Sequence, residues 1–133
     1  MSLIRGFLVA LVVPMVACRS SVKLEASPMV PSARGEVGVG EDRNGNVTVD
    51  LRVKHLAEPA RLTPPKQAYV VWVVPRGEPP ISKGQLVVDQ NLDGRIRLIS
   101  PHRYFEVLVT AEESTLPERP SDQVVLRAVV DRP

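Results

Sequence analysis

The chain has 133 residues, which is enough for one domain. Hydrophobic residues make up 44% of it and charged residues 24%, an ordinary globular balance, but only 4% are aromatic, so Val, Leu and Ile must supply the core. The 17 basic and 15 acidic residues leave a net charge of +2, and no basic stripe with interleaved aromatic residues is present, which argues against nucleic-acid binding. The single cysteine, Cys18, excludes a disulfide within the chain.

Residues 1–17 have the layout of a secretory signal peptide. Arg5 supplies a positive charge, an apolar run extends from Gly6 to Val13, and Pro14 ends the run. This run is shorter than the about 20 residues that a membrane-spanning helix needs. The residues that follow, Met15-Val16-Ala17-Cys18, resemble a bacterial lipobox. The resemblance implies that cleavage makes Cys18 the mature N-terminus and the site of lipid attachment.

Lipid chains on Cys18 would anchor the protein stably, because each buried CH₂ group contributes about 0.8 kcal/mol. The alternatives are an ordinary signal peptide with a coincidental cysteine and an uncleaved anchor. Arg19, rather than Asp, follows the cysteine. By similarity to Gram-negative lipoproteins, this favours the outer membrane or the cell surface over the inner membrane. We therefore expect an extracytoplasmic, membrane-anchored protein.

Residues 18–32 are expected to form a flexible tether between the lipid and the folded domain. The segment contains Ser and Pro with scattered apolar residues, and neither a strand nor a helix period is clear. At about 3.3 Å per residue, such a tether could hold a domain some tens of ångströms from a membrane. The folded domain is expected to span residues 33–133.

From residue 33 onward, a two-residue alternation of apolar and polar side chains predicts β-strands. The first strand is expected at 35–41, and Asn44-Gly45 after it is a strong hairpin signal. Residues 47–54 form the most regular half-buried strand, with four aliphatic side chains on one face. The proline-rich residues 56–66 predict a connection that can cross between two sheets.

The next strand, residues 68–74, is almost entirely apolar, which predicts a central strand covered on both faces. Its Trp72 is therefore expected in the core rather than on a binding surface. Shorter strands separated by polar or proline-bearing turns follow at 83–88, 95–99, 104–111 and 123–130. Seven strands in about 100 residues, with no helical stripe, predict an all-β, antiparallel, immunoglobulin-like sandwich.

The stretch from Tyr69 to Val130 resembles the C-terminal, extracytoplasmic domain of anti-sigma-K factors. The resemblance rests on an ordered set of motifs: Tyr69-Val70-Val71-Trp72-Val73-Val74-Pro75, Gly77, Pro79-Pro80, Gly84-Gln85-Leu86, Asp93-Gly94-Arg95, and Phe105 with Val107, Val109, Thr110 and Glu112. It implies a β-sandwich, and as an alternative function a sensory or regulatory module. Sigma-factor binding is not expected, because the cytoplasmic helical domain and transmembrane helix of those factors have no counterpart in this sequence.

One segment resembles half of a calcium-binding loop. Residues 89–94 read Asp-Gln-Asn-Leu-Asp-Gly, but the twelfth loop position, where a bidentate Glu is needed, holds Ser100. We therefore expect a polar hairpin turn, and calcium or ligand binding remains a third hypothesis. The two histidines, His55 and His102, have no metal-ligand spacing.

The adjacent carboxylates of Glu112 and Glu113 are expected to point to opposite faces of a strand, which is poor geometry for acid–base catalysis. No catalytic, cofactor-binding or metal-binding residue is therefore expected, and the chain is not expected to be an enzyme. The leading hypothesis is an envelope lipoprotein that presents a β-sandwich for protein binding or a structural role. Its expected partners are the membrane, through the lipid on Cys18, and an unidentified envelope protein, with no small-molecule substrate.

Overall fold

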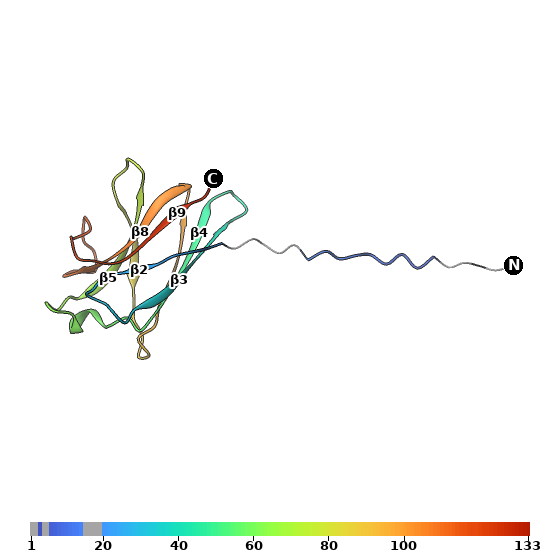
Figure 1. Cartoon of the computed structure of the whole chain (residues 1–133). Coiled ribbons are helices and arrows are strands. Elements are labelled where there is room, and N and C mark those ends of the chain that lie inside the picture. Colours follow the sequence, from blue (N-terminus) through green and yellow to red (C-terminus); the bar gives the residue numbers. More distant parts are fainter. Residues whose placement is uncertain (1–2, 4–5, 15–19) are drawn as a thin grey trace.

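The computed structural model describes residues 3, 6–14 and 20–133 of the chain. Within them, nine strands form two antiparallel sheets that face each other (Figure 1). The elements in chain order are β1 (Ser20–Val22), β2 (Glu25–Ala26), β3 (Arg34–Glu41), β4 (Val47–Lys54), the 3₁₀ helix η1 (Pro59–Arg61), β5 (Ala68–Pro75), β6 (Ile81–Leu86), β7 (Gly94–Ser100), β8 (Tyr104–Glu112) and β9 (Val124–Asp131). The predicted all-β sandwich is confirmed, with two strands more than the sequence indicated.

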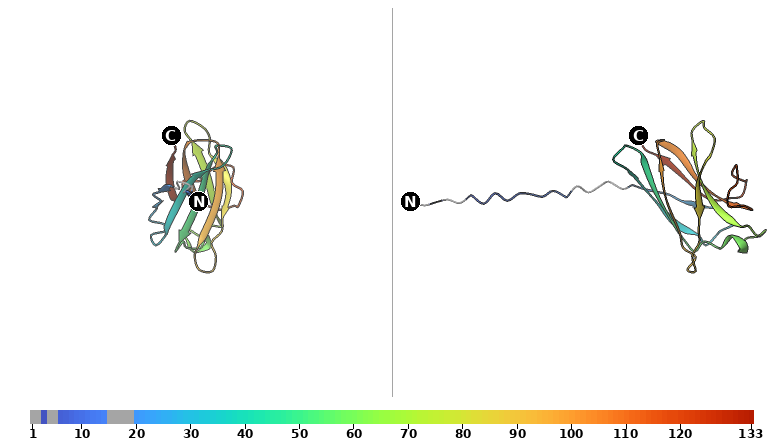
Figure 2. Two further views of the ribbon diagram at one scale, coloured as in Figure 1. Left: turned by 90° about the vertical axis from the view of Figure 1, so that its right-hand side faces the viewer. Right: turned by 180° about the vertical axis from the view of Figure 1, so that it is seen from behind.

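Strands that follow one another in the sequence do not all lie in the same sheet. Sheet A has the order β1-β3-β4-β7, and sheet B has the order β2-β9-β8-β5-β6. Figure 2 shows the two layers from two further sides. All seven predicted strands are present with ends within two residues of the expected ones, and the connection at 56–66 crosses from sheet A to sheet B as predicted.

Aliphatic side chains fill the space between the sheets. Val47, Val49, Leu51 and Val53 of β4 alternate with polar residues and are all buried. From sheet B they meet alternate residues of β5 and β8, among them Phe105, which is completely buried. This core explains how a chain with few aromatic residues and no internal disulfide forms a stable sandwich.

Strand β5 is covered on both faces, as its apolar sequence predicts. Tyr69 points into the main core, where its hydroxyl donates a hydrogen bond to the carbonyl of Ala57, and burial raises the pKa of Tyr69 to about 12. On the opposite face of sheet B, Val70 and Trp72 form a second buried cluster with Leu108 of β8. Trp72 is only 1% exposed, so its predicted burial is confirmed.

A chain of buried hydrogen bonds fixes the second cluster. Trp72 Nε1 donates to Thr110 Oγ1 at 2.8 Å, and the Thr110 hydroxyl donates to Glu112 Oε1 at 2.7 Å. The same carboxylate oxygen accepts the backbone N–H of Ser121 at 2.7 Å. These bonds connect the indole of the only tryptophan to the loop between β8 and β9.

The expected flexible tether is wrong for residues 20–32, which belong to the folded domain. β1 pairs with β3 and β2 pairs with β9, while Val30 lies in the core. Without these short strands, the backbone N–H and C=O groups on the open sides of β3 and β9 would lack partners, which favours pairing. Strands of three and two residues are too short to show a period in the sequence. The domain therefore begins at Ser20 rather than at residue 33.

Residues 6–14 lie outside both sheets with their side chains exposed, and Figure 1 shows them leading away from the sandwich. Phe7 and Leu8 are 94% and 95% exposed. Over the residues that the structure describes, no helix has the length and apolar character required to cross a membrane.

Candidate functional site

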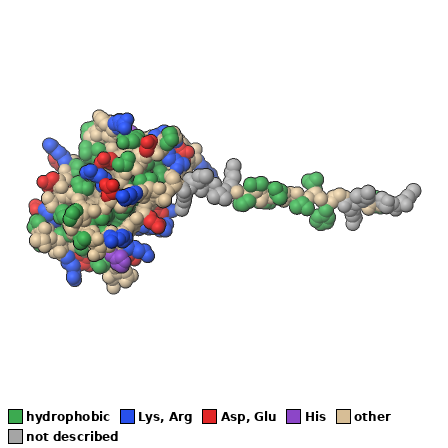
Figure 3. All heavy atoms as spheres, viewed as in Figure 1, with side chains coloured by type: hydrophobic (Ala, Val, Ile, Leu, Met, Phe, Trp, Pro, Cys, Tyr) green, Lys and Arg blue, Asp and Glu red, His purple; other side chains and the backbone are tan. Residues whose placement is uncertain are grey.

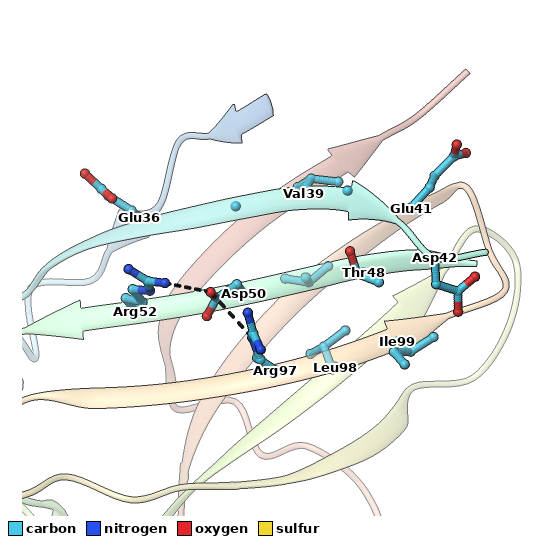
Figure 4. A pocket seen from close by; sticks show the side chains of 13 residues that line it. Glu36, Val39, Glu41, Asp42, Thr48, Asp50, Arg52, Arg97, Leu98 and Ile99 are labelled. Atoms are coloured by element: carbon cyan, nitrogen blue, oxygen red, sulfur yellow. Dashed lines mark hydrogen bonds and ion pairs between the residues drawn. The ribbon is translucent and has the colours of Figure 1, made fainter. Parts of the chain in front are cut away.

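The outer face of sheet A carries a hollow of about 560 Å³, built by neighbouring strands β3, β4 and β7 (Figure 4). Antiparallel pairing sets its side chains in rows across the strands. Gly38, Asp50 and Arg97 make one row, and the next row contains Gly40, Thr48 and Ile99.

The hollow depends on two glycines in the second half of β3, Gly38 and Gly40. A Cβ atom added at Gly38 would come no closer than 3.8 Å to any neighbour, so internal packing does not require a glycine there. At Gly40 an added Cβ would lie 3.0 Å from Thr48 Oγ1, a tighter fit. Glycine inside a strand weakens it, and it often marks a place that another molecule or chain approaches closely. The missing side chains leave open space beside Asp50.

Asp50 lies at the centre of an ion cluster on one side of this hollow. Arg95 binds both of its carboxylate oxygens, with Nε at 3.0 Å and Nη2 at 2.8 Å. Arg52 Nη2 donates to Asp50 Oδ2 at 3.0 Å, and Arg97 Nε lies 3.7 Å from the same oxygen, beyond hydrogen-bonding distance. Figure 4 shows Arg52 and Arg97 on either side of Asp50.

These arginines change the titration of Asp50. Hydrogen bonds from Arg95 have the largest effect and lower the pKa of Asp50. Desolvation by burial raises it, and the hydrogen bond from Arg52 lowers it further. The net result is a fall from 3.8 to about 2. The pairing with Asp50 in turn raises the pKa of Arg95. The Asp50 carboxylate is therefore charged at every physiological pH.

We expect Asp50→Asn to destabilise the domain by about 1–2 kcal/mol at pH 7, because the guanidinium partners are half-exposed and solvent screens them. Since the folded pKa lies below the unfolded one, the contribution of Asp50 is present above pH 3.8 and is lost as the pH falls towards 2. Chemical unfolding of both proteins between pH 7 and pH 2 checks this. A stability difference that stays constant over that range would contradict it.

Three guanidinium groups and two carboxylates, those of Asp50 and of Glu36 opposite Arg52, lie on this side of the hollow, which leaves one positive charge in excess. The acidic residues on the far side are already engaged: Glu41 pairs with Arg103, and Asp42 accepts hydrogen bonds within its own turn. Over the face that Figure 3 shows, acidic and basic side chains are interspersed. The arrangement can hold a carboxylate or another anionic group against Arg97.

The segment that matches half of a calcium loop forms the predicted polar turn, closed by an isolated antiparallel bridge between Val88 and Gly94. It connects β6 of sheet B to β7 of sheet A, so the two strands do not form a hairpin with each other. Asp89 Oδ1 accepts the backbone N–H groups of Asn91 at 2.8 Å and Asp93 at 3.0 Å. In the turn between β3 and β4, Asp42 accepts two backbone N–H groups in the same way. The Asp89 carboxylate is therefore bound by the backbone of its own turn.

The other titratable residues considered in the sequence lie apart from the hollow. His55 follows β4 at a positive φ of 56°, and the Nε2 atom of His102 lies 3.4 Å from Glu78 Oε2. Glu112 is buried and accepts the hydrogen bonds described above, whereas the exposed Glu113 pairs with Lys66 at 3.4 Å. The two adjacent glutamates thus have separate surroundings, as expected.

Cys18, the predicted lipid-attachment site, lies outside the described residues. In the part of the chain that is described, no three His, Cys, Asp or Glu side chains are grouped so that they could hold a metal ion. No protein-family model matches this chain, and no curated protein is significantly similar to it.

The sequence did not reveal the ion cluster around Asp50. Alternation places Asp50 and Arg52 on the wet face of their strand, and Arg95 and Arg97 likewise on theirs. However, β4 and β7 are separated by two strands of the other sheet, and nothing local sets their register. Only the pairing of Asp50 with Arg97 brings the four charges together.

Proposed function

We propose that this protein is a membrane-anchored lipoprotein of the bacterial cell envelope whose β-sandwich binds another protein and performs no catalysis. The observation that carries the proposal is the lipobox-like sequence Met15-Val16-Ala17-Cys18, which ends two residues before the first strand of the domain. A cleavage before Cys18 would remove the apolar N-terminal segment and retain every strand.

The arrangement of the N-terminal residues supports this division. The side chains of residues 6–14 are exposed, and none of them belongs to either hydrophobic cluster. An apolar segment that takes no part in the core is unfavourable in water, but it is suited to recognition as a secretory signal and subsequent removal. Cleavage therefore removes no core contact made by residues 6–14.

The surroundings of the polar residues support a role in binding rather than catalysis. The carboxylates of Asp89 and Glu112 accept hydrogen bonds that hold a turn and a loop, and His102 pairs with Glu78. Asp50 is engaged by arginines. Each of these groups is already used by the fold.

The hollow on sheet A is the surface that we assign to the partner. We infer that the partner supplies an extended segment with a carboxylate side chain. The three arginines exceed the combined charge of Asp50 and Glu36 by one, and the glycine floor admits a backbone. Ile99, which is 53% exposed, adds an apolar contact in the same hollow. β7 is the outermost strand of sheet A, so such a segment can also pair along its edge.

The anchor is tested by Cys18→Ala. Expressed in a bacterial host, the wild-type protein is expected to lose residues 1–17, gain acyl mass and sediment with membranes, because Cys18 carries the lipid. The variant is expected to show neither the acyl mass nor the membrane fraction. Intact mass spectrometry and membrane fractionation measure both. A soluble, unmodified wild-type protein would refute the proposal.

The binding surface is tested by a photoreactive amino acid in place of Ile99 in cells of the source organism. We expect a discrete cross-linked product that weakens in the Arg97→Gln background, because that change removes a cation from the hollow. The matched control places the same amino acid at Leu116, an exposed position (88%) in the loop between β8 and β9. A product that forms equally at both positions, or is indifferent to Arg97, would exclude the hollow as the binding surface.

A further inference from the structure

We propose that the lipid-anchored protein lies directly on the membrane, with one defined end of the sandwich against the lipid headgroups. This inference rests on the proposed lipid attachment at Cys18. It follows from the finding that the domain begins at Ser20, which leaves only Arg19 between the anchor and the first strand. The tether that could have held the domain away from the bilayer is part of the sheets instead.

The distance between anchor and domain is set by covalent geometry. Consecutive Cα atoms are about 3.8 Å apart, so the Cα of Ser20 lies within about 7.6 Å of that of Cys18. The headgroup region of one leaflet is about 5–8 Å thick. Acyl chains on Cys18 insert into the hydrocarbon, which places this cysteine near the base of the headgroups. Ser20 therefore lies within or at the top of the headgroup layer.

The first strand is tied to the rest of the domain, so it does not serve as additional tether. Ser20 is paired with Val39 in sheet A, and Arg132 Nη1 donates to Ser20 Oγ at 3.3 Å and to the Val39 carbonyl at 3.5 Å. Further along, Leu24 packs against the main core. Releasing this segment would break pairing with both sheets and expose apolar surface.

Hydrogen bonds and ion pairs define which end of the sandwich adjoins the anchor. Arg103 donates to the carbonyls of Gly45 at 3.3 Å and Arg132 at 3.0 Å, which joins the β3–β4 turn to the C-terminal residues. The contact of His102 Nε2 with Glu78 Oε2 at 3.4 Å adds the β5–β6 loop. We call residues 42–46, 76–80, 101–103 and 131–133 the anchor end. Ser20 lies at this end because it pairs with Val39, two residues before the end of β3, and Figure 2 shows the C-terminus at the same end of the sandwich.

The exposed side chains of the anchor end and its border suit an interface between water and lipid. Pro79 and Pro80 are exposed, Ile81 beside them is 39% exposed, and Tyr104 is 38% exposed. The guanidinium carbon of Arg76 lies 4.1 Å from the centre of the Tyr104 ring. Tyrosine and arginine combine an apolar body with a polar tip, which matches the headgroup layer of a phospholipid bilayer.

The opposite end then faces away from the membrane. It contains the β6–β7 turn at 89–93 and the β8–β9 loop at 113–123. An eight-residue strand such as β4 spans about 26 Å, so these loops project beyond the headgroups by roughly that distance. The hollow on sheet A lies on the side of the sandwich. Its Asp42 border belongs to the anchor end, whereas Asp50 and Arg52 lie farther along β4, away from the lipid.

The test uses the full-length acylated protein in vesicles of phosphatidylethanolamine and phosphatidylglycerol that contain a headgroup-labelled quencher lipid. Because acylation blocks Cys18, a second cysteine can carry a fluorophore alone. The Pro79→Cys label at the anchor end is expected to be quenched several-fold more than the Leu116→Cys label at the opposite end. Equal quenching, or stronger quenching at position 116, would overturn the inferred orientation of the sandwich. It would not contradict the lipid attachment at Cys18.

A matched insertion variant carries a long Gly-Ser linker between Arg19 and Ser20. The linker gives the domain the flexible tether that the sequence analysis expected at residues 18–32. In this protein we expect the difference between the two labels to decrease, because the domain is free to leave the bilayer. A difference that is unchanged by the linker supports headgroup affinity of the anchor end itself. If mass spectrometry shows no acyl chain on the parent protein, the proposed lipoprotein function fails first.

Discussion

Phe105→Ala is expected to lower the free energy of unfolding by about 3–5 kcal/mol. Phe105 is one of two phenylalanines in the chain, and its side chain is completely buried between the sheets. It is paired with Pro75 on one side and Val130 on the other, so β5 and β9 surround it. The truncation removes apolar surface from the core and leaves a cavity that a β-sheet framework cannot close. Urea unfolding of the two proteins measures the loss.

The matched control is Tyr104→Ala, one position earlier on the opposite face of the same strand. Tyr104 is 38% exposed and contacts Arg76, so its truncation should cost about 1 kcal/mol or less. Similar losses for the two variants would show that the burial of Phe105 does not determine the stability of the domain.

Thr110→Val is expected to destabilise the domain by about 1–3 kcal/mol, although valine has nearly the same shape as threonine. The Thr110 hydroxyl accepts the indole N–H of Trp72 and donates to Glu112, and all three side chains are buried. Valine leaves the buried indole N–H without a partner and removes one of the two donors to Glu112 Oε1. Because Trp72 is the only tryptophan, its emission reports on this site directly.

Urea unfolding followed by Trp72 fluorescence measures this second effect. Thr110→Ser retains the hydroxyl and is the control, with an expected loss below that of Thr110→Val. If serine at this position destabilises the domain as much as valine does, the packing of the threonine methyl contributes as much as the hydrogen-bond chain, and the chain is not the dominant contribution of Thr110. If neither variant changes stability, the buried chain from Trp72 to Ser121 contributes nothing to the fold.

Local sequence pattern was sufficient for the longer strands and their turns. In β4, four aliphatic residues alternate with polar ones over eight positions, and this period alone defines a strand with one buried face. The Asn44-Gly45 pair places the turn that precedes it, and Gly45 has the positive φ of 80° that such a turn needs. These features depend only on neighbours in the sequence, so the order of residues alone predicts them.

Short strands and long-range contacts could not be predicted from local sequence pattern. β1 and β2 have too few residues to show alternation, and their pairing depends on the open sides of β3 and β9. This one difference moves the start of the domain from residue 33 to Ser20. It also changes the proposed position of the sandwich from a distance above the membrane to its surface.

The sequence by itself determined the fold class, the seven longer strands and the burial of Trp72, because two-residue alternation and turn residues act over short stretches of chain. The tertiary structure decided the register between β4 and β7, and with it the ion cluster of Asp50. It also decided that the glycines of β3 lie beside that cluster and form the floor of the hollow. Contacts between residues about 45 positions apart depend on the packing of the whole sandwich, which no local pattern encodes.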